Sequence, residues 1–230
     1  MLNRFIPQIN AQRYIILDAD AIPQPGWAQA MLGAFEQGRQ LFSGSVDVEK
    51  GTFWMRVYNF SMLHEFTPDK PAGNRKHLAA FSLGFTREAY QRIGPFREDI
   101  QRSEDFEWSL RATKAGLQPY FLPGAIIVHE AVKKNSFRSV MSFWFRSGLD
   151  NWRVRQWHAD VLNTPFWMKY PTLILILSPL LAFVPTLRIF KTSAALLIRN
   201  LELLPFIYLT KLVWCWGVFF GFQKDRKNHG

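Results

Sequence analysis

The first 130 residues alternate between short apolar runs and longer stretches with helical spacing. Residues 14–17 and 41–48 have the length and composition of β-strands. Residues 26–37 and 52–66 carry apolar side chains at intervals of three and four, which is typical of helices packed on a core. This alternation of strands and helices predicts an α/β domain.

Stop signals separate the next elements. Residues 67–76 form a polar loop broken by two prolines and a glycine. Such a loop can be a lid beside a site, although ordinary surface loops are commoner. Residues 87–93 are predicted to form a helix that the following Gly-Pro pair ends. A second helix is predicted over residues 103–116, with Ser103 as its N-cap.

The strands carry expectations about their neighbours. Residues 14–17 are apolar throughout, so we expect a strand buried on both faces, and such a strand needs further βαβ units before it. Pro23 and Pro25 are expected to prevent a strand or a helix directly after it. Residues 119–123 and 125–128 are predicted to be two more short strands.

The last hundred residues follow a different pattern. Residues 135–157 are amphipathic and basic, which favours a helix lying on a membrane, with packing on the protein's own core as the alternative. Residues 170–187 and 203–223 are apolar and long enough to approach a membrane span. The basic segment between them disfavours a spanning hairpin, so a shallow interfacial or re-entrant pair is preferred over it.

Charge places a boundary near residue 130. Residues 1–130 hold 14 Lys/Arg and 14 Asp/Glu, whereas residues 131–230 hold 14 and 4, so the net charge of +10 belongs to the second part. We therefore divide the chain into an α/β domain over 1–130, a basic amphipathic region over 131–168 and apolar helices over 169–230.

Basic residues interleaved with long apolar runs fit an anionic lipid surface better than nucleic acid, so lipids are the predicted partner of the second part. Residues 1–12 lack the apolar core of a secretory signal. Cys215 is the single cysteine, which excludes a disulfide framework and a cysteine metal site.

The sharpest chemical signal is Asp18-Ala-Asp20 at the end of the first predicted strand. In an extended chain the two carboxylates point to the same side and repel each other unless a cation lies between them. Mg²⁺ commonly takes one or two carboxylates together with substrate phosphates. The alternative is a polar turn, in which Asp is common. His129, which ends the last predicted strand, adds a candidate imidazole ligand, although a lone His is usually a surface residue.

Two further segments carry candidate chemistry. Ser82 and Gly84 lie in a run of small residues that would let the backbone approach a ligand, or that marks a strand with a bulge. Glu104 and Asp105 open the helix over 103–116. An acidic first turn is favoured by helix electrostatics, but a carboxylate there is also well placed to act as a general base.

In their order and spacing these segments resemble the family 2 glycosyltransferases, inverting enzymes of the GT-A fold that use nucleotide-sugar donors. Asp18 and Asp20 match the DxD element, which binds the metal and the donor. Ser82 and Gly84 match the glycine-containing donor loop. The resemblance covers roughly residues 10–130 and implies a Rossmann-like mixed sheet with flanking helices.

The same resemblance assigns the remaining site residues. Glu104 and Asp105 match the family's xED motif, with Asp105 at the position of the catalytic base. His129 stands where many GT-A enzymes carry a metal-binding histidine. The implied cofactor is Mg²⁺ or Mn²⁺, held by Asp20 with Asp18 and His129. The implied partners are a nucleotide-sugar donor and a lipid-linked or glycan acceptor at the cytoplasmic face of the inner or plasma membrane.

The sequence also departs from the family pattern. The N-terminal βαβ portion that holds the nucleotide is expected to be missing, and Leu2-Asn3 stands where an Arg-Asn pair usually precedes the DxD element. The signature of processive synthases is absent, which disfavours a polymerising enzyme. Two alternatives therefore stay open: an inactive glycosyltransferase fragment, and a non-catalytic membrane-associated protein whose acidic motifs are caps and turns.

Overall fold

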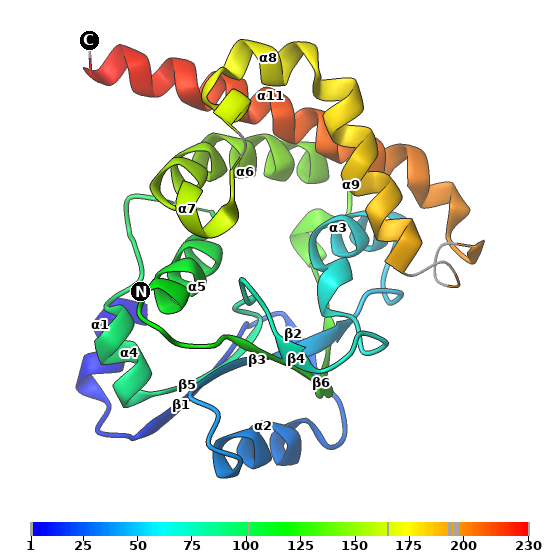
Figure 1. The fold of residues 1–230 in the computed structure, drawn as a ribbon. Coiled ribbons are helices and arrows are strands. Elements are labelled where there is room, and N and C mark those ends of the chain that lie inside the picture. The colour runs from blue at the N-terminus through cyan, green and yellow to red at the C-terminus, as the bar shows by residue number, and fades with distance from the viewer. Residues whose placement is uncertain (1, 101, 165, 193–194, 196–197, 230) are drawn as a thin grey trace. The chain divides into compact units, whose positions relative to one another are not determined.

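The computed structural model describes residues 2–100, 102–164, 166–192, 195 and 198–229, and the chain forms two compact units (Figure 1). Unit 1 comprises Met1–Val48 and Glu65–Glu130, and unit 2 comprises Glu49–His64 and Ala131–Gly230. Residues 49–64, which the sequence placed with the first domain, thus belong to the second unit.

Unit 1 is built on a mixed sheet. Among the described residues, six strands form it in the order β1-β5-β3-β6-β2, with β4 also paired to β6. β3 and β6 are parallel, and the other pairs are antiparallel. The strands are β1 (Arg13–Leu17), β2 (Ala21–Pro23), β3 (Leu41–Asp47), β4 (Gly73–Asn74), β5 (Ser82–Thr86) and β6 (Tyr120–His129).

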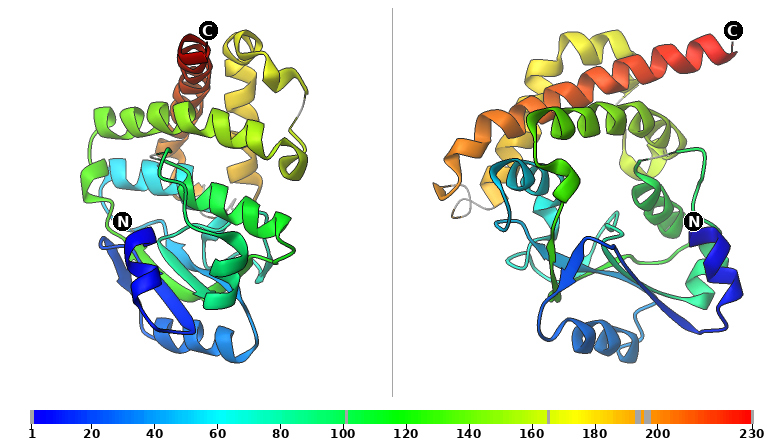
Figure 2. Two further views of the ribbon diagram at one scale, coloured as in Figure 1. Left: turned by 90° about the vertical axis from the view of Figure 1, so that its left-hand side faces the viewer. Right: turned by 180° about the vertical axis from the view of Figure 1, so that it is seen from behind.

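Helices cover both faces of this sheet, as Figures 1 and 2 show. On one face, Met31 and Phe35 of α2 pack on Phe42 of β3. On the other face, Trp108 of α5 contacts Phe85 of β5 edge to face. The helices of unit 1 are α1 (Leu2–Phe5), α2 (Trp27–Glu36), α4 (Arg87–Ile93) and α5 (Glu104–Lys114).

Three strand predictions need correction. β1 is not a central strand buried on both faces: it lies at the edge of the sheet, and Ile15 and Leu17 are each 37% exposed. The prediction that Pro23 excludes a strand is wrong, because β2 is an outer strand and a proline at its end leaves no ladder donor unmade. The two short strands after residue 118 are one strand, β6, with a register shift opposite β3.

Two loop and cap predictions have mixed outcomes. The polar loop over residues 67–76 is held to the sheet, because β4 pairs with β6 and Arg75 N donates to Pro119 O at 2.8 Å. Ser103 does occupy the N-cap of α5, but with a left-handed φ of 67° and without a side-chain capping hydrogen bond. The helix therefore begins without the hydroxyl cap that the sequence suggested.

Unit 2 is helical in the residues that the structure describes. Its helices are α3 (Phe53–Leu63), α6 (Phe137–Trp157), α7 (Ala159–Leu162), α8 (Pro171–Ile176), α9 (Ser178–Thr192) and α11 (Leu204–His229). Short 3-10 helices of unit 2 cover Val132–Lys134, Phe166–Lys169 and Leu201–Leu203, whereas Ile6–Gln8 lies in unit 1 and His64–Phe66 crosses the boundary between the units in the sequence. The apolar stretch over residues 170–187 is thus two helices, which meet at Leu177.

The amphipathic helix α6 buries its apolar face inside unit 2. Trp144 donates through Nε1 to Ser61 Oγ of α3 at 3.1 Å, and Lys211 Nζ of α11 lies 4.0 Å from the Trp144 ring centroid. Lys211 Nζ also donates to Ser61 O at 2.6 Å, which satisfies the one charge in the middle of the apolar helix. The interpretation of α6 as a helix packed on the protein's own core accounts for these contacts.

Glycines let α6 and α11 approach closely. A Cβ added to Gly148 would overlap Trp214 O, and one added to Gly217 would overlap Phe145 O. Small residues at a helix crossing are typical of packing in membranes, although soluble proteins use them too. Among the described residues, one helix, covering Leu201–Lys224, is long and apolar enough to cross a membrane by length and composition.

Gly84 in the middle of β5 gives a direct test of the packing in unit 1. A Cβ at this position would overlap the Phe42 ring, so Gly84→Ala is expected to destabilise the fold by about 1–3 kcal/mol through overpacking. The matched control is Gly33→Ala in α2, where a Cβ meets nothing within 4 Å and helix propensity predicts a gain of about 0.5–1 kcal/mol. Chemical unfolding of both variants measures the difference, and equal stabilities would contradict this packing.

Candidate active site

A turn at the end of β1 positions Asp18 and Asp20. Asp18 N donates to Phe81 O at 3.2 Å, which extends the pairing of β1 with β5 by one bond. Asp18 O accepts a hydrogen bond from Ala21 N at 3.0 Å, which closes the turn before β2. The two carboxylates are therefore brought together by a turn, and not by the extended geometry that the sequence suggested.

Strand pairing adds His129 to this turn. Ala21 of β2 is the register partner of His129 at the end of β6, and Glu130 N donates to Asp20 O at 2.8 Å. His129 is 8% exposed, and its Nε2 lies 3.4 Å from Asp20 Oδ1. The backbone of β2 and β6 thus holds the imidazole against the exposed carboxylate of Asp20.

Asp18, Asp20 and His129 form a donor set that fits a divalent cation. Their ligand atoms all lie within 4.8 Å of one another. Ligands of one Mg²⁺ or Mn²⁺ ion lie about 3 Å apart in cis and about 4 Å apart in trans, so a small closure completes the arrangement. Burial raises the pKa of Asp18, and the Asp20 carboxylate raises it further, while His129 opposes the rise. A cation at this position would relieve that repulsion.

Asp105 lies in the first turn of α5. Its Oδ2 accepts a hydrogen bond from Ala80 N at 3.1 Å, and its Oδ1 accepts one from Phe106 N at 2.7 Å. Burial raises the pKa of Asp105, whereas the two backbone N–H groups and His77 lower it. The carboxylate is thus oriented by two fixed donors while burial strengthens its affinity for a proton.

Glu104 lies beside Asp105 and is partly exposed. Burial first, and then the charge of Asp105, raise its pKa to about 7, with a smaller contribution from Asp18. Asp18 in turn is influenced by Asp105. The acidic start of α5 and the turn after β1 therefore belong to one electrostatic cluster, in which carboxylates from separate segments repel one another.

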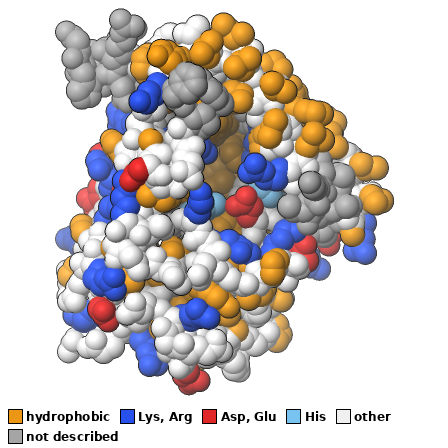
Figure 3. Space-filling view, in the orientation of Figure 1, with side chains coloured by type: hydrophobic (Ala, Val, Ile, Leu, Met, Phe, Trp, Pro, Cys, Tyr) orange, Lys and Arg blue, Asp and Glu red, His pale blue; other side chains and the backbone are white. Residues whose placement is uncertain are grey.

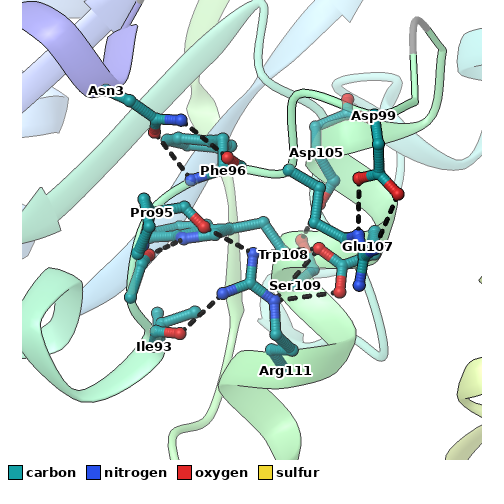
Figure 4. A network of polar contacts seen from close by, with 12 residues as sticks. Asn3, Ile93, Pro95, Phe96, Asp99, Asp105, Glu107, Trp108, Ser109 and Arg111 are labelled. Atoms are coloured by element: carbon teal, nitrogen blue, oxygen red, sulfur yellow. Dashed lines mark hydrogen bonds and ion pairs between the residues drawn. The ribbon is translucent and has the colours of Figure 1, made fainter.

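A polar network fixes α5 to the turn that precedes it (Figure 4). Arg111 donates to Ile93 O and to Pro95 O, each at 2.7 Å, and also binds the buried Glu107 carboxylate at 2.9 Å. Trp108 Nε1 donates to Gly94 O at 2.8 Å. Because each carbonyl of the 93–95 turn is bound by Trp108 or Arg111, α5 is held against this turn.

Asn3 extends the same network toward the N-terminus. Its side-chain amide donates to Phe96 O at 2.7 Å and accepts from Phe96 N at 2.8 Å, as Figure 4 shows. The sequence marked Asn3 only as the remnant of a family motif. In the structure it is a bidentate link between α1 and the loop before α5.

The predicted donor residues Ser82 and Gly84 lie in the core of unit 1. Ser82 is fully buried, and its Oγ accepts a hydrogen bond from Trp27 Nε1 of α2 at 2.9 Å. Gly84 lies against the Phe42 ring on the same side of β5. The hydroxyl of Ser82 is thus committed to α2, and packing accounts for Gly84. These contacts argue against direct contact of the donor with the Ser82 hydroxyl or with the backbone at Gly84.

Sequence reasoning missed two basic residues of the cluster. His77, at the end of the polar loop, influences Asp105 electrostatically, and its ring lies 5.1 Å from that of Phe106. Arg102 opposes the rise in the pKa of Glu104. Neither residue belongs to a sequence motif, so only the folded structure shows that both lie near the acidic residues of α5.

The high pKa of Glu104 predicts a pH-dependent cost to stability. Because the folded pKa of about 7 exceeds the ordinary value of 4.5, the unfolded chain releases this proton first, and stability falls as pH rises from 4.5 to 7. The loss is at most about 3 kcal/mol and is reduced by partial exposure to solvent. Glu104→Gln, measured in the presence of a chelator, should therefore unfold at higher denaturant than the wild type at pH 8, and at the same denaturant at pH 4.

The exposed Glu36 of α2 offers a matched control for this measurement. Glu36→Gln removes a carboxylate outside the cluster, and the variant should follow the wild type at both pH values. A gain at pH 8 in both variants would assign the effect to the net charge of the protein and not to the site.

Unit 1 is an α/β domain with helices on both faces of its mixed sheet and with two aspartates and a histidine at one end, as expected for the GT-A fold. The family model described as "Glycosyl transferase family group 2" matches residues 15–222. This match covers most of the chain, and the chain therefore belongs to that family. No curated protein matches it.

A similar solved structure is that of a mannosyltransferase from Pyrobaculum calidifontis in complex with GDP-Man and Mn²⁺. The likeness has a TM-score of 0.55 at 16% sequence identity and covers 94% of this chain. The chain spans 64% of the length of that mannosyltransferase. At this identity the likeness shows a shared fold.

Proposed function

We propose that this protein transfers a sugar from a nucleoside-diphosphate sugar to an acceptor at a membrane surface, with inversion at the anomeric carbon. One observation carries the proposal: Asp18, Asp20 and His129 form a donor set for a divalent cation, and this set shares one electrostatic cluster with Asp105. Sugar transfer from a nucleotide needs both parts, one for the diphosphate and one for the acceptor hydroxyl.

Asp105 is the proposed general base. Its two oxygens are oriented by Ala80 N and Phe106 N, and each oxygen keeps a lone pair for the proton of an acceptor hydroxyl. A raised pKa brings a carboxylate closer to the operating pH, where a general base is most efficient. Direct attack by the deprotonated hydroxyl displaces the nucleoside diphosphate and inverts the anomeric carbon.

Asp20, Asp18 and His129 are the proposed ligands of a bound Mg²⁺ or Mn²⁺. Such a cation supplies charge neutralisation for the diphosphate leaving group. The exposed Asp20 carboxylate is accessible to an incoming donor, whereas His129 is buried and would bind the cation from the protein side. The Mn²⁺ and GDP-Man of the Pyrobaculum mannosyltransferase support this assignment by analogy.

The acceptor is proposed to be lipid-linked or a glycan close to the cytoplasmic face of the membrane. The support comes from unit 2, whose helix over Leu201–Lys224 is long and apolar enough for a span. The excess of basic residues after residue 130 favours the leaflet that carries anionic lipids. These features suit an enzyme that meets its acceptor at the membrane.

The test is a donor panel with the detergent-solubilised chain and Mn²⁺. Guanosine, uridine, thymidine and cytidine diphosphate sugars are each incubated with a membrane lipid extract, and the released nucleoside diphosphate and the transferred sugar are measured. We expect release from one donor that depends on Mn²⁺, and a product of inverted anomeric configuration by NMR. A chain that binds no donor and shows no Mn²⁺-dependent thermal shift would contradict the proposal.

A further inference from the structure

The helices α8 and α9 have an inverted distribution of side chains. Seven large apolar side chains of residues 171–187 are exposed, whereas Ile174 and Ile189 are buried; the exposed ones are Leu173, Ile176, Leu177, Leu180, Phe183, Val184 and Leu187. Within α9, Leu180, Phe183, Val184 and Leu187 recur at intervals of three and four and so lie on one face; together with the exposed residues 173–177 they are called the outer stripe here. Figure 3 shows the apolar side chains gathered over α8 and α9.

The buried side of α9 consists of small residues in its first half and includes Ile189 near its end. Ser178, Ala182 and Thr186 are each at most 4% exposed and follow one another at intervals of four. Thr186 Oγ1 donates to Ala182 O at 2.7 Å, so its hydroxyl is satisfied within the helix. Small residues inside and large apolar residues outside are the reverse of a helix that faces water, and are typical of a helix that faces lipid.

The surroundings of this stripe are cationic. Residues 161–200 contain four Lys/Arg and no Asp/Glu. Lys169 and the exposed Tyr170 stand at its start, and the exposed Arg188 stands at its end. A recess of about 430 Å³ opens at this start, lined by Lys169, Tyr170, Pro171, Thr172, Leu173 and Phe222. Basic and aromatic residues at the ends of an apolar stretch are the usual anchors at the level of lipid headgroups.

We infer that the outer stripe of α8 and α9 is a docking face for an anionic lipid membrane, buried in one leaflet with Lys169 and Arg188 at the headgroups. From residue 171 to residue 187 a straight helix would rise only about 25 Å, and the break at Leu177 shortens the apolar stripe further, so the stripe is too short for a span and lies in one leaflet. The inference specifies the membrane attachment within the proposed function, and it does not depend on sugar transfer.

The test measures flotation of the detergent-purified chain with phospholipid vesicles after the detergent is removed. The wild type is expected to float with vesicles that contain about a third of anionic lipid, and less with neutral vesicles or at high salt. The double variant Leu180→Glu/Phe183→Glu should lose at least tenfold in partitioning. The control is Leu32→Glu, since Leu32 is a helical residue of α2 with 53% exposure, and this variant should float as the wild type does.

A fluorescent probe gives a second readout that does not require loss of binding. An environment-sensitive dye attached at Val184→Cys should shift to the blue when vesicles are added, whereas the same dye at Leu32→Cys should not. Cys215 is buried and stays in both variants, and the unsubstituted chain measures its labelling. Equal shifts at the two positions, or normal flotation of the double variant, would overturn the inference. The inference would also be overturned if the wild type is a dimer in solution and the double variant Leu180→Glu/Phe183→Glu is a monomer that binds vesicles as well as the wild type does.

Nucleoside diphosphate release in detergent separates this inference from the proposed function. The double variant should keep the release rate of the wild type while it loses vesicle binding. If the wild type binds vesicles through this face and turns over no donor, the sugar-transfer proposal fails and the docking face stands.

Discussion

Replacing Asp105 with Asn is expected to lower the turnover number by about 10²–10⁴-fold, because general-base catalysis contributes that much when a carboxylate takes the acceptor proton. The amide cannot accept this proton, yet it has nearly the same shape as the carboxylate. Binding of the donor should persist, since its diphosphate is assigned to Asp18, Asp20 and His129. Transfer assays and donor-induced thermal shifts measure the two effects separately.

Asn at position 105 also changes the local hydrogen bonds, so folding must be measured alongside activity. The wild-type carboxylate accepts from Ala80 N and from Phe106 N. An amide keeps one acceptor and turns its NH₂ group toward the other donor, at a cost of about 1–3 kcal/mol. Ala80 and Phe106 thus make Asp105 a structural residue as well as the proposed base. A loss of turnover counts for the base role only at temperatures where the variant remains folded.

Glu104 is the competing candidate for the base, because its pKa of about 7 also suits that role. The comparison with Glu104→Gln decides between them. If Asp105 is the base, Glu104→Gln should retain most of the turnover and gain stability at high pH. A larger activity loss in Glu104→Gln than in Asp105→Asn would assign proton transfer to Glu104. Asp99→Asn serves as the surface control, since Asp99 pairs with Arg97 on the exposed loop before α5.

The cluster of candidate metal ligands could be predicted from the sequence because its geometry is local. Asp18 and Asp20 are two residues apart, and any tight turn after β1 keeps them close. His129 was found through its position at the end of a strand, and the pairing of β2 with β6 brings it to the aspartates. The position of Glu104 and Asp105 in the first turn of α5 could be predicted for the same reason, since neighbouring residues determine where a helix begins.

The surroundings of Ser82 and Gly84 could not be predicted from the sequence, because they depend on which face of a strand points to which helix. Ser82 and Gly84 alternate with Leu83 and Phe85 along β5, and no pattern in the segment reveals that the first pair faces α2. His77 escaped notice because long-range packing alone brings it to Asp105. The edge position of β1 likewise follows from strand order, which apolar composition does not determine.

The second large effect is expected from Asp20, the exposed ligand of the proposed metal. Asp20→Ala removes a charged oxygen ligand, and we expect Mn²⁺-dependent nucleoside diphosphate release to fall to the level seen with excess chelator. Saturating Mn²⁺ should not restore it, because the remaining Asp18 and His129 leave two ligands where the wild type has three. Release of nucleoside diphosphate across a Mn²⁺ titration measures this loss.

Stability supplies a readout of the same site that does not require an acceptor. A ligand present at 100 times its dissociation constant stabilises the folded state by about 2.7 kcal/mol, which raises the melting temperature by roughly 5–10 °C in a chain of this size. Mn²⁺ with the matching nucleoside diphosphate should produce such a shift in the wild type and in Asp69→Asn, a surface control from the polar loop. Asp20→Ala and His129→Ala should show no shift. If Asp20→Ala keeps the full shift, the metal lies elsewhere, and the diphosphate would have to be neutralised by other residues than those of the turn after β1.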